Sequence, residues 1–173
     1  MKPELFVIDV DGVMTTGHFI YSDKGKVFKI FGPDDSDGLS LLKKYIKVRF
    51  VTGDKRGFEI SKKRIHDDMG YEIDLVSTTN RKEWISQIIN IRKVIYMGDG
   101  LLDSIVLSEC GYAICPKNAS HVAKKQSDYI SKYNGGDRAV ADACLHILEK
   151  FFKPFDPKID LSSYSNNFGH WTS

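Results

Sequence analysis

Four aspartates in this 173-residue sequence stand in two closely spaced pairs, each directly after a short apolar run. Asp9 and Asp11 follow the first run, and Asp99 and Asp103 follow a later one. Within the first pair, one carboxylate can attack an electrophile while the other handles a proton. Four uncompensated anions would repel one another, so the two pairs together predict a bound cation. Oxygen ligands select a hard ion, and Mg²⁺ is the usual partner of phosphate chemistry.

Residues suited to holding an anion accompany these acids. Thr52 and Gly53 end another apolar run, where a hydroxyl group and a free backbone N–H at a helix N-terminus form an anion cradle. Gly12 permits the sharp turn that must follow the first aspartates. A basic residue, Arg81 or Lys82, opens a later predicted helix and could neutralise a phosphate oxygen.

The helical phase bears on which of these two cations faces the site. The residues four, seven and eight positions after Arg81 are all isoleucine, whereas only one of the corresponding positions after Lys82 is apolar. An apolar stripe must face the sheet while a catalytic group faces the site, so the phase favours Arg81. Both residues stay candidates.

Short apolar runs and amphipathic segments alternate along the chain. Strands are predicted at residues 5–8, 47–51, 73–76, 94–97 and 111–114, and helices at 37–45, 57–69, 80–91 and 138–152. This alternation is typical of βαβ units, and it predicts a doubly wound α/β fold with a parallel sheet covered on both faces. In such a sheet the chemistry lies beyond the carboxyl ends of the strands, where the aspartate pairs and Thr52 fall.

A predicted β-hairpin over residues 17–31 interrupts this alternation. It consists of two apolar runs joined by a short turn that contains glycine. Its three lysines, Lys24, Lys26 and Lys29, are expected to face solvent or an interface. The hairpin should project from the same sheet edge as Asp9.

The length fits one domain, predicted at residues 1–152, with an extended tail at 153–173. The tail keeps four aromatic residues, so it is expected to lie on its own domain or across a neighbouring subunit. These residues are Phe155, Tyr164, Phe168 and Trp171.

The composition excludes several classes of protein. The formal net charge is +2, which argues against a nucleic-acid binder. No apolar run approaches the roughly 20 residues that span a bilayer, and no signal region opens the chain, so we expect a cytoplasmic protein with no membrane partner. The three cysteines and five histidines have no metal-ligand spacing and are read as structural.

These pieces, in this order, resemble the haloacid dehalogenase (HAD) superfamily of phosphohydrolases. Its motifs DxDGV and GDxxxD fall on the two aspartate pairs, and its threonine and basic residue fall on Thr52 and on Arg81 or Lys82. The resemblance covers residues 4–150 and implies a HAD-like Rossmannoid, a three-layer α/β sandwich. The small size leaves no room for a cap domain.

Three segments resemble the capless branch of this superfamily, which contains 3-deoxy-octulosonate 8-phosphate and nonulosonate 9-phosphate phosphatases. The segments are DGVMTTGHFIY at 11–21, FGPDDSDGLSLLKK at 31–44 and GGDRAVAD at 135–142. The resemblance implies Mg²⁺-dependent removal of the terminal phosphate from an eight- or nine-carbon ulosonate. It also implies a homotetramer in which a neighbour's hairpin or tail completes each active site.

The resemblance implies a role for each acid. Asp9 attacks phosphorus and forms an aspartyl-phosphate, while Asp11 protonates the leaving oxygen and then activates water. Asp9, the backbone carbonyl of Asp11, and Asp99 hold Mg²⁺, and Asp103 holds a metal-bound water or the basic residue. Thr52 and backbone N–H groups near the two glycines bind the other phosphate oxygens.

Several positions depart from the octulosonate pattern. Asp54 and Asp34 stand where arginines are usual, and Gly100 replaces a second acid or amide. Relatives that act on nine-carbon ulosonates can carry an acid after Thr-Gly, so the sequence favours a nonulosonate 9-phosphate. Ordinary acids at helix N-termini explain Asp54 and Asp34 equally well. Asp54, together with Arg56 or Arg64, is a candidate for binding substrate, although a solvated helix face also explains the arginines.

Three other functions compete with this hypothesis. A phospho-accepting receiver module also carries acids, a threonine and a basic residue, but it lacks DxDGV and the hairpin. A phosphatase for another small sugar phosphate and a catalytically idle homologue are the remaining alternatives. Divalent-dependent turnover of a phosphate ester separates an enzyme from a receiver or an idle homologue.

Overall fold

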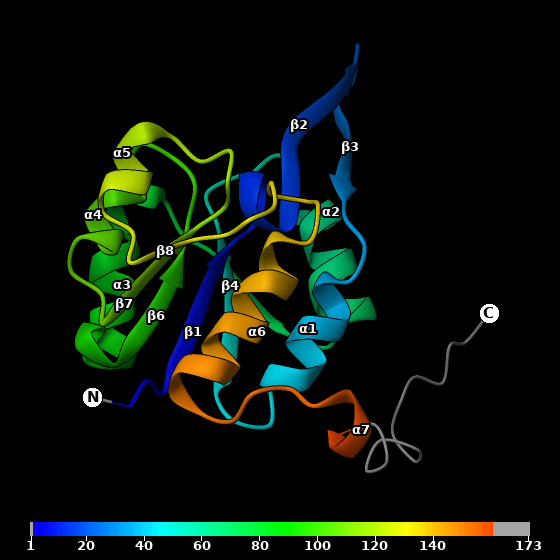
Figure 1. Ribbon diagram of the computed structural model, residues 1–173. Helices are drawn as coiled ribbons and strands as arrows, with labels where there is room; N and C mark the ends of the chain where they lie inside the picture. Colours follow the sequence, from blue (N-terminus) through cyan, green and yellow to red (C-terminus); the bar gives the residue numbers. More distant parts are fainter. Residues whose placement is uncertain (1, 161–173) are drawn as a thin grey trace.

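The computed structural model describes residues 2–160, and a parallel sheet forms its centre (Figure 1). The sheet has six strands in the order β5-β4-β1-β6-β7-β8, and all neighbouring strands are parallel. The strands are β1 (Leu5–Asp9), β4 (Lys47–Thr52), β5 (Glu72–Leu75), β6 (Val94–Met97), β7 (Tyr112–Cys115) and β8 (Tyr129–Ile130). The chain runs from β1 toward β5 and then returns to the other side through β6, so the strand order reverses at β1. Ligand sites of open α/β sheets lie at this switch point.

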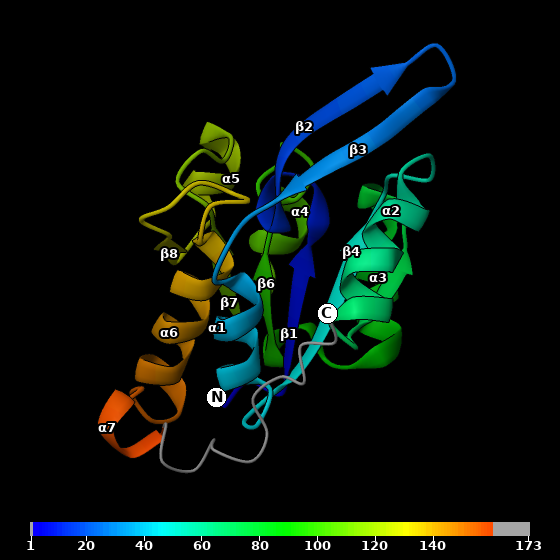
Figure 2. The same ribbon diagram turned by 90° about the vertical axis from the view of Figure 1, so that its right-hand side faces the viewer.

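Helices cover both faces of the sheet. Phe6 and Ile8 of β1 pack in a core cluster with residues of α1 and α6, whereas Leu5 and Val7 pack in a second cluster with residues of α3, α4 and α5. Figure 2 shows α1 and α6 side by side. The helices are α1 (Asp35–Leu42), α2 (Phe58–Lys62), α3 (Arg81–Ile88), α4 (Ser104–Leu107), α5 (His121–Lys125), α6 (Ala139–Phe151) and α7 (Pro157–Asp160). Shorter or irregular helical turns lie at Val10–Met14, Lys63–Asp68, Thr78–Asn80 and Ile91–Lys93. The predicted doubly wound α/β fold is confirmed.

The predicted hairpin forms and is slightly longer than expected. β2 (Thr15–Ser22) and β3 (Gly25–Phe31) pair antiparallel and extend away from the sheet edge at which β1 ends (Figures 1 and 2). Six large apolar residues of the hairpin are exposed: Phe19, Ile20, Tyr21, Val27, Phe28 and Ile30. Apolar residues gathered on one projecting element can mark an interaction site.

The end of the described chain turns back onto the domain. Phe155 packs against the core cluster that includes α1 and α6, and α7 follows it. Tyr164, Phe168 and Trp171 lie outside the described residues, so the domain limits and the course of the tail stay predictions. Among residues 2–160, no helix is both long and apolar enough to cross a membrane.

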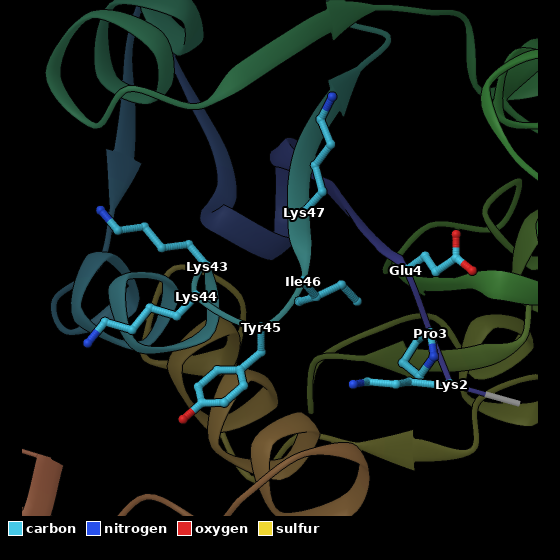
Figure 3. A pocket seen from close by; sticks show the side chains of 8 residues that line it. All are labelled: Lys2, Pro3, Glu4, Lys43, Lys44, Tyr45, Ile46 and Lys47. Atoms are coloured by element: carbon cyan, nitrogen blue, oxygen red, sulfur yellow. The ribbon is translucent and has the colours of Figure 1, made fainter.

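A pocket of about 600 Å³ opens at the amino end of the sheet (Figure 3). It is lined by residues that precede β1 or lead into β4: Lys2, Pro3, Glu4, Lys43, Lys44, Tyr45, Ile46 and Lys47. The aspartate pairs follow the carboxyl ends of β1 and β6, so this pocket lies at the opposite edge from them.

Candidate active site

The first aspartate pair stands where β1 gives way to a tight turn. Asp9 is the last residue of β1, and Asp11 and Gly12 lie in the helical turn Val10–Met14. Gly12 has a φ of +92°, and a Cβ added there would lie 2.2 Å from Oδ2 of Asp99. Only glycine allows the turn to approach Asp99 so closely.

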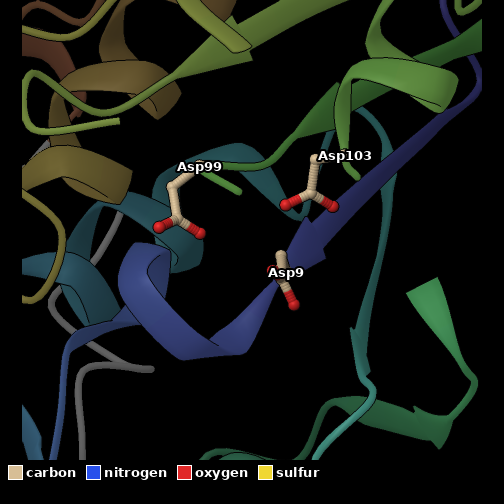
Figure 4. Close-up of side chains that lie close together, drawn as sticks. All are labelled: Asp9, Asp99 and Asp103. Carbon is tan, nitrogen blue, oxygen red and sulfur yellow. The ribbon is translucent and has the colours of Figure 1, made fainter. Parts of the chain in front are cut away.

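Three of the four predicted aspartates converge at this edge (Figure 4). Asp9, Asp99 and Asp103 each offer a carboxylate oxygen, and these oxygens lie within 4.8 Å of one another. Asp99 and Asp103 belong to the loop between β6 and α4, where the Gly100 backbone N–H donates to Oδ2 of Asp103 at 2.8 Å. The Asp11 carboxylate does not belong to this group among the described residues, so three of the four carboxylates expected around the cation lie together. The backbone carbonyl of Asp11 stays a predicted ligand.

Arg81, at the start of α3, carries the cation that faces these acids. Its Nη2 lies 2.9 Å from Oδ1 of Asp9, and its Nη1 lies 2.7 Å from Oδ1 of Asp103. The residue is 2% exposed. Lys82 points elsewhere, because its Nζ pairs with Glu109 at 2.7 Å on the surface. The structure therefore brings Arg81, and not Lys82, to the acids; Arg81's catalytic role stays a prediction.

Tyr96 is a buried member of this cluster that the sequence analysis missed. Its hydroxyl group donates to Oδ1 of Asp103 at 2.5 Å and accepts from Nη1 of Arg81 at 2.8 Å. It lies in β6, two residues before the GD motif, so its spacing resembles that of an ordinary core aromatic. The one available clue was a hydroxyl group in an otherwise apolar strand, because a buried hydroxyl needs a partner.

Burial shifts the proton affinities of the acids. Burial raises the pKa of Asp9 well above its usual value, although Arg81 opposes the shift. Burial, and then the charge of Asp103, raise the pKa of Asp99 to about 7. Three carboxylates face one guanidinium, so the cluster has an excess of negative charge that a cation would offset. An all-oxygen donor set of this charge fits Mg²⁺.

The Asp11 carboxylate contacts Thr52 and Lys29 rather than the three clustered acids. The Thr52 hydroxyl group, at the end of β4, donates to its Oδ2 at 2.9 Å. Nζ of Lys29 lies 2.7 Å from its Oδ1. The expectation that Lys29 faces solvent or an interface is wrong, because its side chain is 0% exposed and reaches inward from β3.

Asp54, the acid that follows Thr52 and Gly53, also forms an ion pair with Lys29. The Asp54 carboxylate lies 2.9 Å from Nζ of Lys29, pairs also with Lys26, and accepts from the Gly57 backbone N–H at 3.1 Å. Burial opposes its ionisation, but hydrogen bonds from Lys26 and Lys29 outweigh burial and lower the pKa of Asp54 to about 2. The expectation that Lys26 faces solvent or an interface is wrong as well, since its side chain is 4% exposed and pairs with Asp54 of the same chain. Asp54 thus fastens the hairpin to the loop after β4.

The other predicted substrate contacts lie around this loop. Gly53 is exposed directly after β4, and Arg56 is exposed just before α2. Arg64 is half-buried in the turn Lys63–Asp68, which continues α2 away from the strand end. Contacts of these residues with substrate stay predictions.

Comparison with known proteins identifies the family. The family model of the haloacid dehalogenase-like hydrolases matches residues 18–144, which is more than half of the chain. The chain therefore belongs to this family and is a hydrolase, as predicted.

The chain is also similar to named sugar-phosphate phosphatases. The 3-deoxy-D-manno-octulosonate 8-phosphate phosphatase of Salmonella typhi is 27% identical over 149 residues, which are 83% of this chain and 78% of that protein. The Escherichia coli K12 enzyme of the same name is also 27% identical, with the same coverage of both chains.

Solved structures agree with these relatives. A Moraxella catarrhalis 3-deoxy-D-manno-octulosonate 8-phosphate phosphatase, crystallised with a magnesium ion, a phosphate ion and KDO, superposes with a TM-score of 0.75 at 29% identity, covering 85% of this chain and 86% of that one. A cobalt-bound Haemophilus influenzae deoxy-D-mannose-octulosonate 8-phosphate phosphatase gives a TM-score of 0.75 at 25% identity, covering 86% and 88%. The predicted Mg²⁺ cofactor agrees with these findings and with the cluster of three acids.

Proposed function

We propose that the chain is a Mg²⁺-dependent phosphatase that removes the terminal phosphate of an ulosonate phosphate through an aspartyl-phosphate. The orientation of Asp9 carries this proposal. Among the described residues, both hydrogen bonds to its carboxylate, from the Val10 backbone N–H and from Arg81, fall on Oδ1. Oδ2 is thereby left as the oxygen that can attack phosphorus.

The other residues have complementary roles in this proposal. Asp11 protonates the departing sugar oxygen and then takes a proton from the water that hydrolyses the aspartyl-phosphate. Backbone N–H groups near Gly12 and Gly53 bind the oxygens that are not transferred, while the Thr52 hydroxyl group, whose one proton goes to Asp11, orients that carboxylate. Arg81 fixes the orientation of the Asp9 carboxylate.

The three clustered acids, Asp9, Asp99 and Asp103, surround the position that fits the cation. Asp9 and Asp99 would hold Mg²⁺ together with the backbone carbonyl of Asp11, while Asp103 is occupied with Arg81 and Tyr96. When bound, Mg²⁺ offsets the negative charge of the nucleophile and of the phosphoryl oxygens.

The relatives favour an eight-carbon substrate. Both curated relatives and both solved structures described above are octulosonate 8-phosphate phosphatases by name. The acids that pointed toward a nine-carbon ulosonate have partners within this chain: Asp54 pairs with Lys26 and Lys29, and Asp34 accepts from Nε of Arg138 at 2.7 Å. Their charges are therefore weak evidence for a different sugar, and we propose 3-deoxy-D-manno-octulosonate 8-phosphate as the first candidate.

We further propose that the chain forms a homotetramer through its hairpin. The six exposed apolar residues of β2 and β3 support this proposal, because a hairpin that projects into solvent gains stability when a partner covers such residues. Light scattering after size exclusion would measure the mass. A wild-type tetramer that dissociates when Phe28 is replaced by glutamate supports the proposal, and a wild-type monomer contradicts it.

Phosphate release with Mg²⁺ tests the catalytic proposal. The substrates are octulosonate 8-phosphate, several nonulosonate 9-phosphates and common hexose phosphates, and Asp9→Ala is the control. A strong preference for octulosonate 8-phosphate that is lost in the variant supports the proposal. Preference for a nonulosonate or a hexose phosphate would change the substrate, and no turnover of any ester would indicate a catalytically idle homologue.

A further inference from the structure

Lys29 is an unusual residue for a projecting hairpin. The other residues of β3 are exposed or half-buried, yet the side chain of Lys29 is 0% exposed. Its Nζ lies 2.7 Å from Asp11, 2.9 Å from Asp54 and 2.8 Å from Oγ of Ser61. Burying an ammonium group is costly unless it is paired, and here Nζ donates a hydrogen bond to Ser61 and lies beside two carboxylates.

The contact with Asp11 complements the one from Thr52. The Thr52 hydroxyl group donates to Oδ2 of Asp11 at 2.9 Å, while Lys29 lies against Oδ1. The carboxylate thus accepts a hydrogen bond at Oδ2 and has an ion-pair partner at Oδ1, and these two contacts from different elements restrict its rotation. The pair therefore defines where the Asp11 carboxylate points relative to Asp9.

Lys26 provides an internal comparison. It lies on the same strand, and its Nζ pairs with Asp54 and lies 3.4 Å from the centre of the Phe19 ring. Its ion pair is with Asp54 rather than with Asp11. Two neighbouring lysines thus fasten the hairpin to the loop after β4, but only Lys29 of the two reaches the acid–base residue.

We propose that Lys29 is a positioning residue, which orients the Asp11 carboxylate for proton transfer and makes the hairpin part of the acid–base apparatus. This inference rests on the proposed phosphatase function. It goes beyond that function because it assigns a catalytic purpose to a residue of the hairpin. A shift of β3 would move the ammonium group and with it one of the two supports of Asp11.

The dependence on the leaving group tests this proposal. Formation of an aspartyl-phosphate from a sugar phosphate needs a proton donor for the alkoxide, whereas p-nitrophenolate leaves without one. We therefore measure kcat/KM of wild type and Lys29→Met for p-nitrophenyl phosphate and for the sugar phosphate that wild type hydrolyses best. General acid catalysis is worth about 10²–10⁴-fold, so we expect the variant to lose roughly 100-fold on the sugar phosphate and less than about 5-fold on the aryl phosphate.

Matched variants separate positioning from general damage. The quantity compared is the ratio of kcat/KM for the sugar phosphate to kcat/KM for p-nitrophenyl phosphate. Lys26→Met should keep the wild-type value of this ratio, and Asp11→Asn should lower it as Lys29→Met does. In the Asp11→Asn background, Lys29→Met should lower the ratio no further. If Lys29→Met does not fold, Lys29→Met/Asp54→Asn removes one charge of each sign and should show the same change in ratio.

Each outcome decides a separate point. Equal losses on both esters, or no loss, in a folded Lys29 variant of an active wild type would overturn the role of Lys29 and leave the phosphatase function intact. A wild type that hydrolyses neither ester would refute the phosphatase function itself. A light-scattering mass equal to that of wild type ensures that the comparison is made on the same assembly.

Discussion

Replacing Arg81 by alanine tests which of the two candidate cations, Arg81 or Lys82, serves the active site. Arg81 is 2% exposed and makes short contacts with Asp9 and Asp103, whereas the side chains of Lys82 and Glu109 are 46% and 40% exposed. Breaking a buried ion pair typically costs about 3–5 kcal/mol of stability, and losing an exposed pair costs about 0–1 kcal/mol. The two substitutions should therefore differ greatly.

The same geometry gives the expected kinetic effect. Without Arg81 the Asp9 carboxylate keeps only its hydrogen bond from the Val10 backbone N–H among the described residues, and the three clustered acids lose their guanidinium partner. Loss of one preorganised charged donor at a reacting group costs about 10²–10³-fold in kcat, so we expect that range for Arg81→Ala and a change of less than about 2-fold for Lys82→Ala.

Urea unfolding and phosphate release measure the two effects. Mg²⁺ should restore part of the stability lost in Arg81→Ala, since a bound cation offsets the same acids. Similar losses of activity in Arg81→Ala and Lys82→Ala, or unfolding of Arg81→Ala at the wild-type urea concentration in the absence of Mg²⁺, would rule out this role of Arg81.

Three further predictions concern the turn, the metal and the core. Gly12→Ala places a Cβ 2.2 Å from Oδ2 of Asp99 at a φ of +92°, so we expect a loss of about tenfold or more in Mg²⁺ affinity by calorimetry, and unchanged affinity would contradict the account. The pKa of Asp99 is raised to about 7, so Mg²⁺ must displace a proton from this carboxyl group at acidic pH. The Mg²⁺ concentration for half-maximal activity should therefore rise by up to about tenfold for each pH unit below 7. Removal of Mg²⁺ by a chelator should abolish turnover. Asp35 of α1 accepts from the Ala141 backbone N–H at 2.9 Å, and burial raises its pKa to about 6. The folded state binds this proton more tightly than the unfolded state, so the free energy of unfolding should fall by up to about 3 kcal/mol as pH rises from about 4 to above 6. Asp35→Asn should flatten this dependence in urea titrations, and an unchanged slope would refute the assignment.

The acid cluster was predictable because it depends on a general property of parallel sheets. The carboxyl ends of β1 and β6 meet at one edge, so aspartates that follow two apolar runs had to converge there. Helical phase favoured Arg81 over Lys82, and α3 does bury Arg81 and Ile85, although Ile88 of the same predicted stripe is exposed.

The contacts of Lys29 and Tyr96 could not be predicted from local pattern. Lysines at alternating or near-alternating positions of a hairpin normally face solvent, and the burial of Lys29 depends on Asp11 and Asp54 from two other elements. Tyr96 has the spacing of a core residue and gains its role only from Arg81 and Asp103 across the strand end.

Four short elements were also missed. These are α4, α5, α7 and β8, which are too brief to show a period of 3.6 or 2 residues, so hydrophobic patterning carries little information there. β8 pairs with β7 at the edge of the sheet, and its formation depends on that neighbour. α6 has a clear apolar stripe and was placed within one residue at each end, whereas α1 and α3 each end three residues earlier than predicted.

Trapping the covalent intermediate on Asp9 is the most direct test of the central claim. Wild-type protein would be mixed with Mg²⁺ and octulosonate 8-phosphate, quenched in acid during turnover, digested and analysed by mass spectrometry. We expect the N-terminal peptide containing Asp9 to carry one phosphoryl group, and Asp9→Ala to carry none and to release no phosphate. Turnover by Asp9→Ala, or a phosphoryl group on a different residue, would contradict it.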